Sequence, residues 1–181
     1  MIATTYHAPL GEIELTADER GLTGLWFADS RPSDLSGAYA QVDETDIFCE
    51  HIDGADAESG SPGLSFEEQC NAAAVGVLER TWAWLNSYFA GQAPLWIPPL
   101  HLEGEELSHE VWAAILAVPY GETTSCAALV ARMAARGIVA DADAVATVLS
   151  RSPINLIVPT HRAIAVPGVA HQDDLLALER K

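Results

Sequence analysis

Three β-type segments separated by two turn sequences occupy the first 28 residues, and this pattern constrains the fold more than any other feature. The segments span residues 2–7, 12–17 and 22–28. The connections are Pro9-Leu10-Gly11 and Asp18-Glu19-Arg20-Gly21, whose Pro, Gly and Asp residues favour tight turns. Short connections of this kind join neighbouring antiparallel strands, so the pattern predicts an antiparallel meander.

A long amphipathic helix is predicted between Phe66 and Phe89. Apolar residues recur there at intervals of three and four, which places them on one face of a helix. Gly91 and Pro94 follow and end the helix. The apolar face is expected to cover one side of the meander.

The segment from Asp29 to Gly63 has the composition of a solvated insertion. It is rich in Asp, Glu, Ser, Gly and Pro, and Arg31 is its single basic residue. Structureless loops of this length are unusual, so part of it is expected to be disordered or locally helical. Two interpretations remain open, a passive surface loop and an acidic segment that binds another protein.

Prolines 94, 98 and 99 mark a linker, which predicts one domain over residues 1–100 and a second over 101–181. In the second domain, Ser108 is expected to cap a helix that ends at Pro119-Tyr120-Gly121. Two further helices are predicted, from Thr124 or Ser125 to Arg136 and from Asp141 to about Arg151. This pair forms a helix-turn-helix candidate. A buried strand or extended segment at 156–158 and a closing helix from Asp173 to Arg180 complete the chain.

Composition places the chain among ordinary globular proteins, with 49% hydrophobic and 19% charged residues. No apolar run approaches the roughly 20 residues that cross a bilayer, and no secretory signal is visible, so a cytoplasmic protein without membrane contact is expected. The cysteines are Cys49, Cys70 and Cys126. Their odd number and their spacing predict reduced structural thiols, with no disulfide framework, metal site or cofactor.

The formal net charge of -17 argues against high affinity for nucleic acid. Residues 1–100 contain 16 acidic residues and 3 arginines, whereas residues 101–181 contain 10 acidic and 6 basic residues. Proteins that hold DNA neutralise its phosphates with Lys and Arg. Non-specific affinity for DNA is therefore expected to be poor.

The tetrapeptide Pro159-Thr160-His161-Arg162, after the apolar run Leu156-Ile157-Val158, stands at the centre of a wider pattern. The chain resembles the O6-alkylguanine-DNA alkyltransferases, also called methylated-DNA-protein-cysteine methyltransferases. The resemblance implies an α+β fold, with a small antiparallel sheet and helix followed by a winged-helix-like, helix-turn-helix domain of the alkyltransferase type. It rests on the tetrapeptide and on Val111-Trp112, Val118 to Thr123, Ser125, Asp143-Ala144-Val145, Pro153, Leu175 to Glu179, Pro9 to Gly11, Gly21 to Phe27 and Tyr88 to Gly91.

The resemblance implies that Thr160 stands where the family carries its acceptor cysteine, in Pro-Cys-His-Arg. A thiol ionises near neutral pH with modest help, whereas a hydroxyl ionises far higher, and each pKa unit costs roughly 1.4 kcal/mol. Methyl transfer to Thr160 is therefore not expected. His161 and Glu179 match the residues that polarise the acceptor through a water, and without an acceptor they are expected to form a buried network. Arg162 and Pro159 match structural positions.

Further departures affect DNA binding. Asp143 stands where the family has an arginine that enters the duplex, and Cys126 stands where a tyrosine pushes out the target nucleotide. Cys126 follows the family serine, Ser125, and the family asparagine is replaced by Ser152. The loop after Arg162 is shorter than in the family, which predicts a base pocket that is open or refilled.

Three functions follow from this pattern. The first is a catalytically inactive homologue with weak or no DNA binding, which contacts an unidentified protein through its acidic N-terminal half. The second is an alkyltransferase-like protein that binds O6-alkylguanine in double-stranded DNA and recruits other repair. The third is an active alkyltransferase that uses another cysteine; Cys126 lies at a predicted helix N-terminus, which lowers a thiol pKa, although a small packing residue is the alternative there.

Overall fold

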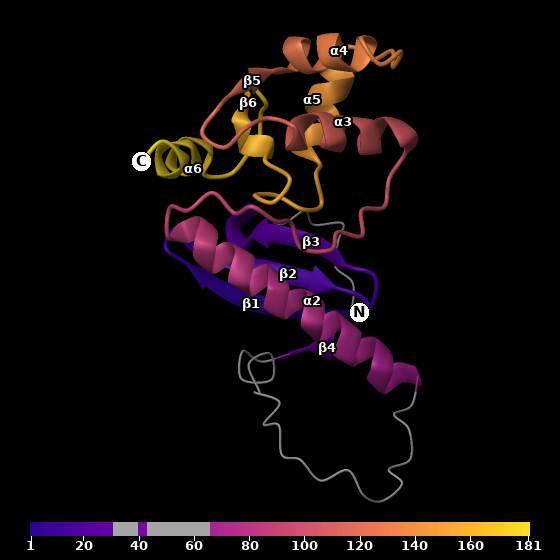
Figure 1. The fold of residues 1–181 in the computed structure, drawn as a ribbon, viewed down its shortest axis with the longest axis vertical. Coiled ribbons are helices and arrows are strands. Elements are labelled where there is room, and N and C mark those ends of the chain that lie inside the picture. Colours follow the sequence, from indigo (N-terminus) through magenta and orange to yellow (C-terminus); the bar gives the residue numbers. More distant parts are fainter. Residues whose placement is uncertain (31–39, 43–65) are drawn as a thin grey trace, which may run out of the picture.

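The computed structural model describes residues 1–30, 40–42 and 66–181 (Figure 1). Most of the predicted insertion, and Cys49 within it, lies outside these ranges. The predicted meander is confirmed as β1 (Ile2–Ala8), β2 (Gly11–Ala17) and β3 (Leu22–Phe27). A two-residue strand, β4 (Ala40–Gln41), adds parallel to β1, so the sheet order is β3-β2-β1-β4.

The predicted long helix is confirmed as α2 (Phe66–Phe89), which crosses one face of the sheet in Figure 1. Leu78 and Leu85 on this helix are fully buried. The rings of Tyr6 on β1 and Trp82 on α2 meet edge to face with their centroids 5.1 Å apart. The apolar face that the sequence predicts for this helix therefore packs against the sheet, as expected.

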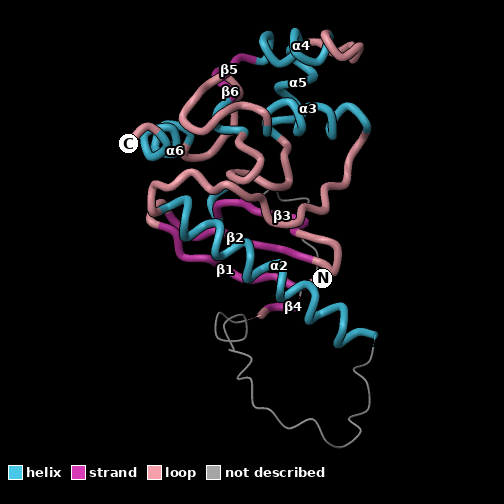
Figure 2. Tube along the Cα trace, in the orientation of Figure 1, coloured by secondary structure: helices cyan, strands magenta, loops and turns pink. Residues whose placement is uncertain are grey.

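The rest of the chain is mainly helical and lies beside the sheet (Figure 2). It contains α3 (Glu106–Leu116), α4 (Cys126–Ala134), α5 (Ala142–Ser150) and α6 (Gln172–Glu179). Two short 3-10 turns, η1 (Ala28–Ser30) and η2 (Thr160–Arg162), and a two-stranded sheet of β5 (Thr124–Ser125) and β6 (Ala163–Ile164) are the other regular elements of the described residues. Within the described residues, no helix is long and apolar enough to cross a membrane.

Two of the three predicted helix caps are confirmed. Ser125 Oγ accepts from the Ala128 amide at 3.2 Å, and Asp141 Oδ1 accepts from the Ala144 amide at 2.7 Å. The Ser108 cap is wrong, because the cap position of α3 is Glu105, three residues earlier, and its side chain makes no capping hydrogen bond. The segment 156–158 is buried as predicted but forms only isolated bridges, since Leu156 adopts a left-handed conformation with φ 71°.

The outer edge of β3 is covered by two main-chain segments that are distant in sequence. Leu22 donates to the Pro99 carbonyl and accepts from the His101 amide, both at 2.8 Å. Further along the strand, Leu25 donates to the Pro153 carbonyl and accepts from the Asn155 amide, both at 2.9 Å. These bonds join the sheet to the helical part at two points.

Candidate functional site

The tetrapeptide singled out in the sequence forms the turn η2, which is buried between the sheet and α6. Thr160 and His161 are each 1% exposed. The Thr160 amide donates to the Val158 carbonyl at 2.7 Å, and the Arg162 amide donates to the Pro159 carbonyl at 3.0 Å. This tight turn points two neighbouring polar side chains into the protein interior.

Glu179, at the end of α6, is the centre of a buried polar network. Its side chain has no exposed surface and accepts from His161 Nε2 at 2.8 Å. Arg162 donates to both carboxylate oxygens at 2.9 Å, and the Gly121 amide donates to Oε2 at 2.9 Å. The Tyr88 hydroxyl donates to Oε1 at 2.8 Å. The carboxylate is therefore held by four different residues.

The protonation states follow from these contacts. Burial alone would raise the pKa of Glu179, but hydrogen bonds from His161, Arg162 and Gly121 lower this pKa to about 2. Burial lowers the pKa of His161, against the opposing effect of Glu179. Burial also raises the pKa of Tyr88. At neutral pH the site thus holds an anionic Glu179 and a neutral His161 that donates through Nε2.

A neutral His161 carries its lone pair on Nδ1. This atom is buried and has no hydrogen-bond partner among the described residues. The Thr160 hydroxyl, in turn, donates to Asn155 Oδ1 at 3.3 Å. The potential base and the hydroxyl at the acceptor position are therefore not paired with each other by any hydrogen bond in the described part of the chain.

A cavity of about 10 Å³ borders Thr160 and His161. A single water needs about this much space, and a purine ring needs far more. The sequence predicted a pocket that is open or refilled, and the cavity at this position is small. The lining residues are Phe27, Asn155, Leu156, Thr160, His161, Val169, Ala170 and Leu175.

His171 fixes the loop that borders this cavity through Val169 and Ala170. Its backbone is left-handed, with φ 52°, and its ring lies 4.4 Å from the ring of Phe27, centroid to centroid. Its Nε2 lies 3.4 Å from Asp29 Oδ2, and its Nδ1 lies 3.9 Å from Asp174 Oδ2. The loop of the helical part is thereby held against the end of β3.

The residues predicted to face DNA lie on the α4–α5 pair. Cys126 is the first residue of α4 and Asp143 lies in the first turn of α5. Burial raises the pKa of the Cys126 thiol, and the charge of Asp143 raises it further. The pKa of this thiol is thus raised on balance, opposite in direction to the lowering that a helix N-terminus causes. Ser152 is buried, and its hydroxyl donates to the Ile154 carbonyl at 3.1 Å.

The structure thus brings Thr160, His161, Arg162 and Glu179 together. It places Ser125 and Cys126 at the start of α4 and Asp143 in the first turn of α5. Sequence reasoning missed the roles of Tyr88, Gly121 and Asn155. Tyr88 lies on the apolar face of the predicted long helix, and a tyrosine there indicates a buried hydrogen-bond partner for its hydroxyl. No local pattern pointed to Gly121 or Asn155. Within the described ranges, no group of three His, Cys, Asp or Glu side chains is placed to hold a metal ion.

Comparison with known proteins agrees with this arrangement. The family model for the ribonuclease-like domain of 6-O-methylguanine DNA methyltransferase matches residues 1–96, and the model for its DNA binding domain matches residues 106–181. Both halves of the chain therefore match models of one protein family.

Individual relatives carry the same name, methylated-DNA--protein-cysteine methyltransferase. The Mycobacterium leprae protein is 39% identical over 51% of this chain and 54% of its own length, so the chain spans about half the length of that relative. The Rattus norvegicus protein is 30% identical over 91% of this chain and 71% of its own length.

Solved structures share the fold. The O6-methylguanine methyltransferase of Mycobacterium tuberculosis aligns with a TM-score of 0.71 at 24% identity, covering 99% of this chain and 92% of that chain. M. tuberculosis OGT in complex with DNA aligns with a TM-score of 0.71 at 23% identity, covering 99% and 93%. The sheet, the helical part and the matches along both halves together place this chain in the methylated-DNA-protein-cysteine methyltransferase family.

Proposed function

We propose that this chain is a catalytically inactive member of its family, with weak or no DNA binding. The observation that carries the proposal is the state of Thr160, which is buried and donates its hydroxyl proton to Asn155 Oδ1. An oxygen nucleophile needs a base to remove its proton, and the hydroxyl is not hydrogen-bonded to His161. Thr160 is therefore a structural residue at the acceptor position.

The small volume of the cavity beside Thr160 supports the same function. Alkyl transfer requires a base to enter a pocket beside the acceptor, and enzymes of this kind flip the nucleotide out of the duplex. The space beside Thr160 is about 10 Å³, with Val169 and Ala170 among its lining residues. The site accordingly has no room for guanine in this conformation.

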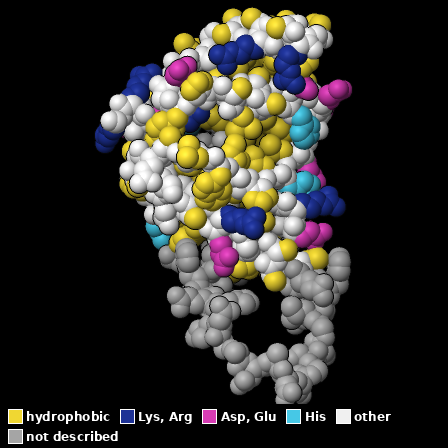
Figure 3. Space-filling view, in the orientation of Figure 1, with side chains coloured by type: hydrophobic (Ala, Val, Ile, Leu, Met, Phe, Trp, Pro, Cys, Tyr) yellow, Lys and Arg dark blue, Asp and Glu magenta, His cyan; other side chains and the backbone are white. Residues whose placement is uncertain are grey.

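Surface charge supports weak DNA binding. The first turn of α5 carries Asp143, and its cap is Asp141. Carboxylates at this position repel phosphates. On the face drawn in Figure 3, Lys and Arg side chains are scattered and do not form one continuous stripe. DNA affinity usually comes from clustered basic residues that neutralise phosphates and release counterions. The described part of this face has no such cluster.

The described cysteines do not supply a substitute nucleophile. A hydrogen bond to Glu19 raises the pKa of Cys70, and burial raises the pKa of Cys126. Both thiols are therefore largely protonated at neutral pH, and a thiol is a poor nucleophile. An active enzyme that works through either of these residues is disfavoured.

A second function, binding of alkylated DNA without repair chemistry, is favoured by one observation. The α4–α5 pair is intact, with both side-chain caps in place, and it lies within the match to the DNA binding domain. On this alternative the protein retains lesion recognition and recruits other repair. The inactive function also includes binding of a protein partner through the acidic N-terminal half.

Intact-mass analysis of the chain after incubation with an O6-methylguanine duplex tests these functions. The wild-type chain is expected to gain no methyl group, and a stoichiometric gain would overturn the inactive function. Thr160→Cys is the matched variant, since it restores the acceptor type without changing the loop. A methyl group on this variant alone would show that the damaged base reaches the site, which favours the second function.

A gel shift with the same duplex at about 50 mM salt separates the remaining functions, because phosphate contacts contribute most at low salt. Equal, weak retention of damaged and undamaged duplex supports the inactive function. Retention that depends on the lesion would support the second function instead.

A further inference from the structure

A second cavity, of about 330 Å³, lies where β2 and β3 meet the segment 99–103 and Pro153. It shares no lining residue with the Thr160 cavity. Its volume is that of a small-molecule site. The lining residues are Met1, Thr16, Asp18, Thr23, Trp26, His101, Glu103 and Pro153.

The walls of this cavity are fixed by main-chain contacts. Leu22 makes two main-chain hydrogen bonds with the segment 99–101. Leu25 donates one to the Pro153 carbonyl and accepts one from the Asn155 amide. Gly21 packs so closely on this segment that a Cβ atom there would lie 2.8 Å from the Leu100 carbonyl carbon. The cavity is therefore preformed, which reduces the entropy lost on binding.

The polar end of the cavity is an oriented carboxylate–imidazole pair. Asp18 Oδ1 accepts from the amides of Arg20 and Gly21 at 2.9 and 3.0 Å, and Oδ2 lies 2.6 Å from His101 Nδ1. Burial would raise the pKa of Asp18, but these hydrogen bonds lower it below its usual range. Asp18 thus stays anionic at neutral pH, and its side chain remains 20% exposed.

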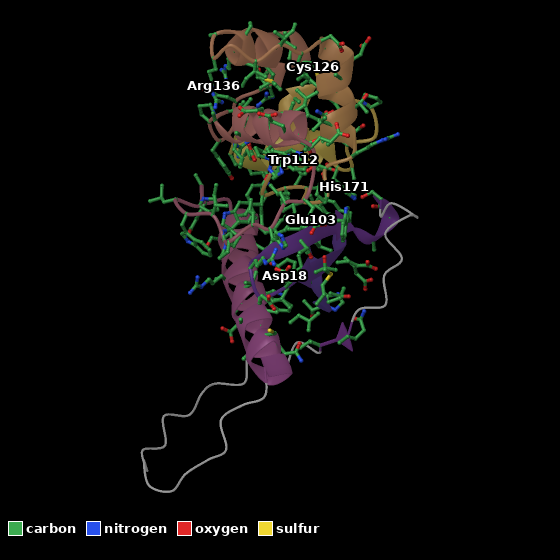
Figure 4. All side chains as sticks on the ribbon, turned by 90° about the vertical axis from the view of Figure 1, so that its right-hand side faces the viewer. Asp18, Glu103, Trp112, Cys126, Arg136 and His171 are labelled. Carbon is green, nitrogen blue, oxygen red and sulfur yellow. The ribbon has the colours of Figure 1, made fainter. Side chains whose placement is uncertain are left out.

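A second carboxylate, Glu103, lies at the rim, and its residue is exposed. In Figure 4, Asp18 and Glu103 lie on the same side of the molecule, at the junction of the sheet and the helical part. Met1, Trp26 and Pro153 supply apolar surface beside these charges. The cavity accordingly combines an anionic end with an apolar wall that includes an indole.

We propose that this cavity binds an organic cation, an alkylammonium or guanidinium group attached to an apolar body. Two carboxylates attract the charged head, and Met1, Trp26 and Pro153 line the cavity for the apolar body. Residues 1–100 contain 16 acidic residues and 3 arginines, and a net negative charge of this kind favours association with cations. Because no three metal-ligating side chains converge in the described residues, the geometry favours an organic cation over a metal ion.

Two kinds of ligand contain such a cation, a free small amine and the Lys or Arg side chain of a peptide. The proposal is independent of the proposed function, since no residue of the Thr160 site takes part. It is tested with the full-length chain labelled with ¹⁵N and titrated with pentylammonium, pentanol and pentanoate, which share an apolar body and differ in charge.

The expected result is a saturable shift of the Trp26 indole N–H and of the Thr16 and Thr23 amides with pentylammonium alone. Glu103→Gln should weaken this binding about threefold, as expected for a partly exposed charge pair. Glu12→Gln is the control, because Glu12 is also an exposed glutamate of the sheet part but does not line this cavity; it should leave the binding unchanged.

Equal shifts with pentylammonium and pentanol, or no shifts at these residues, would overturn the proposal. So would a Glu103→Gln variant that binds as tightly as the wild type. A capped Gly-Gly-Lys-Gly-Gly peptide distinguishes the sources: shifts of the same signals identify a side chain of a peptide as a ligand, and shifts with pentylammonium alone identify a free amine.

Discussion

The hydroxyl of Tyr88, near the end of α2, donates a hydrogen bond of 2.8 Å to Glu179 Oε1, at the end of α6. The two residues are 91 positions apart, so this bond ties the helix that covers the sheet to the last helix of the chain. Both side chains are buried. The network around η2 therefore includes a residue from the N-terminal half.

Tyr88→Phe is expected to destabilise the protein by about 1.5–3 kcal/mol, because hydrogen bonds to charged groups contribute this much. Tyr6→Phe is the matched control on the sheet, where the hydroxyl donates to a neutral acceptor, Asn86 Oδ1, at 2.9 Å. That variant should lose only about 0.5–1.5 kcal/mol. Urea unfolding monitored by tryptophan fluorescence measures both losses, and equal losses would contradict the charged state of Glu179.

Glu179→Gln should be severely destabilising, by about 3–5 kcal/mol, since it leaves the Arg162 guanidinium buried without its counter-charge. Asp174→Asn, on the same helix but with a side chain 66% exposed, should change stability by less than about 0.5 kcal/mol. The free energy of unfolding from urea titration gives the comparison. A Glu179→Gln protein of wild-type stability would show that the network does not hold the fold together.

Acid should destabilise the protein through the same carboxylate. Glu179 has a pKa of about 2 in the folded chain and 4.5 as its ordinary value, so the unfolded chain binds its proton first as pH falls. Its contribution, about 3 kcal/mol, is present above pH 4.5 and is lost between pH 4.5 and pH 2.

His161 acts in the same direction at higher pH. Its pKa is lowered from 6.5 in the folded chain, so stability falls below pH 6.5 as the unfolded chain takes up the proton. Urea midpoints measured from pH 7.5 to pH 3 should show both losses. In Glu179→Gln the loss below pH 4.5 should be smaller than in the wild type, and an unchanged profile would contradict the assignment to Glu179.

Asp143→Arg should raise the affinity for double-stranded DNA at low salt, because it replaces a carboxylate in the first turn of α5 with a phosphate ligand. The slope of log affinity against log salt concentration should steepen by about one unit. Glu12→Arg makes the same change of charge on β2 and should have a smaller effect. Fluorescence anisotropy with a labelled duplex measures both, and identical gains would show that net charge alone controls the affinity.

Local signals in the sequence predicted the elements well. The turn residues around β2, the apolar periodicity of α2 and the side-chain caps at Ser125 and Asp141 each act over a few residues, and each is confirmed. The Ser108 cap was wrong because several polar residues compete there, and α3 begins after Glu105 without any of their side chains as a cap.

The candidate site was predictable only in part. His161, Arg162 and Glu179 were found from the family pattern. Tyr88 and Gly121 contact Glu179 across long sequence distances, and Asn155 contacts Thr160 only because the backbone between them turns. The pKa of Cys126 is raised, because burial and the charge of Asp143 act against the lowering that a helix start favours. The burial of a single polar side chain depends on contacts from distant segments, which a local pattern does not record.

The bonds from Pro99, His101, Pro153 and Asn155 to the outer side of β3 have a practical consequence for dissecting this chain. A fragment that stops before residue 99 would present a bare strand, and bare strands recruit other copies. Excising the N-terminal half for separate study would therefore produce a fragment that self-associates through β3, and biochemistry on the sheet requires the intact polypeptide.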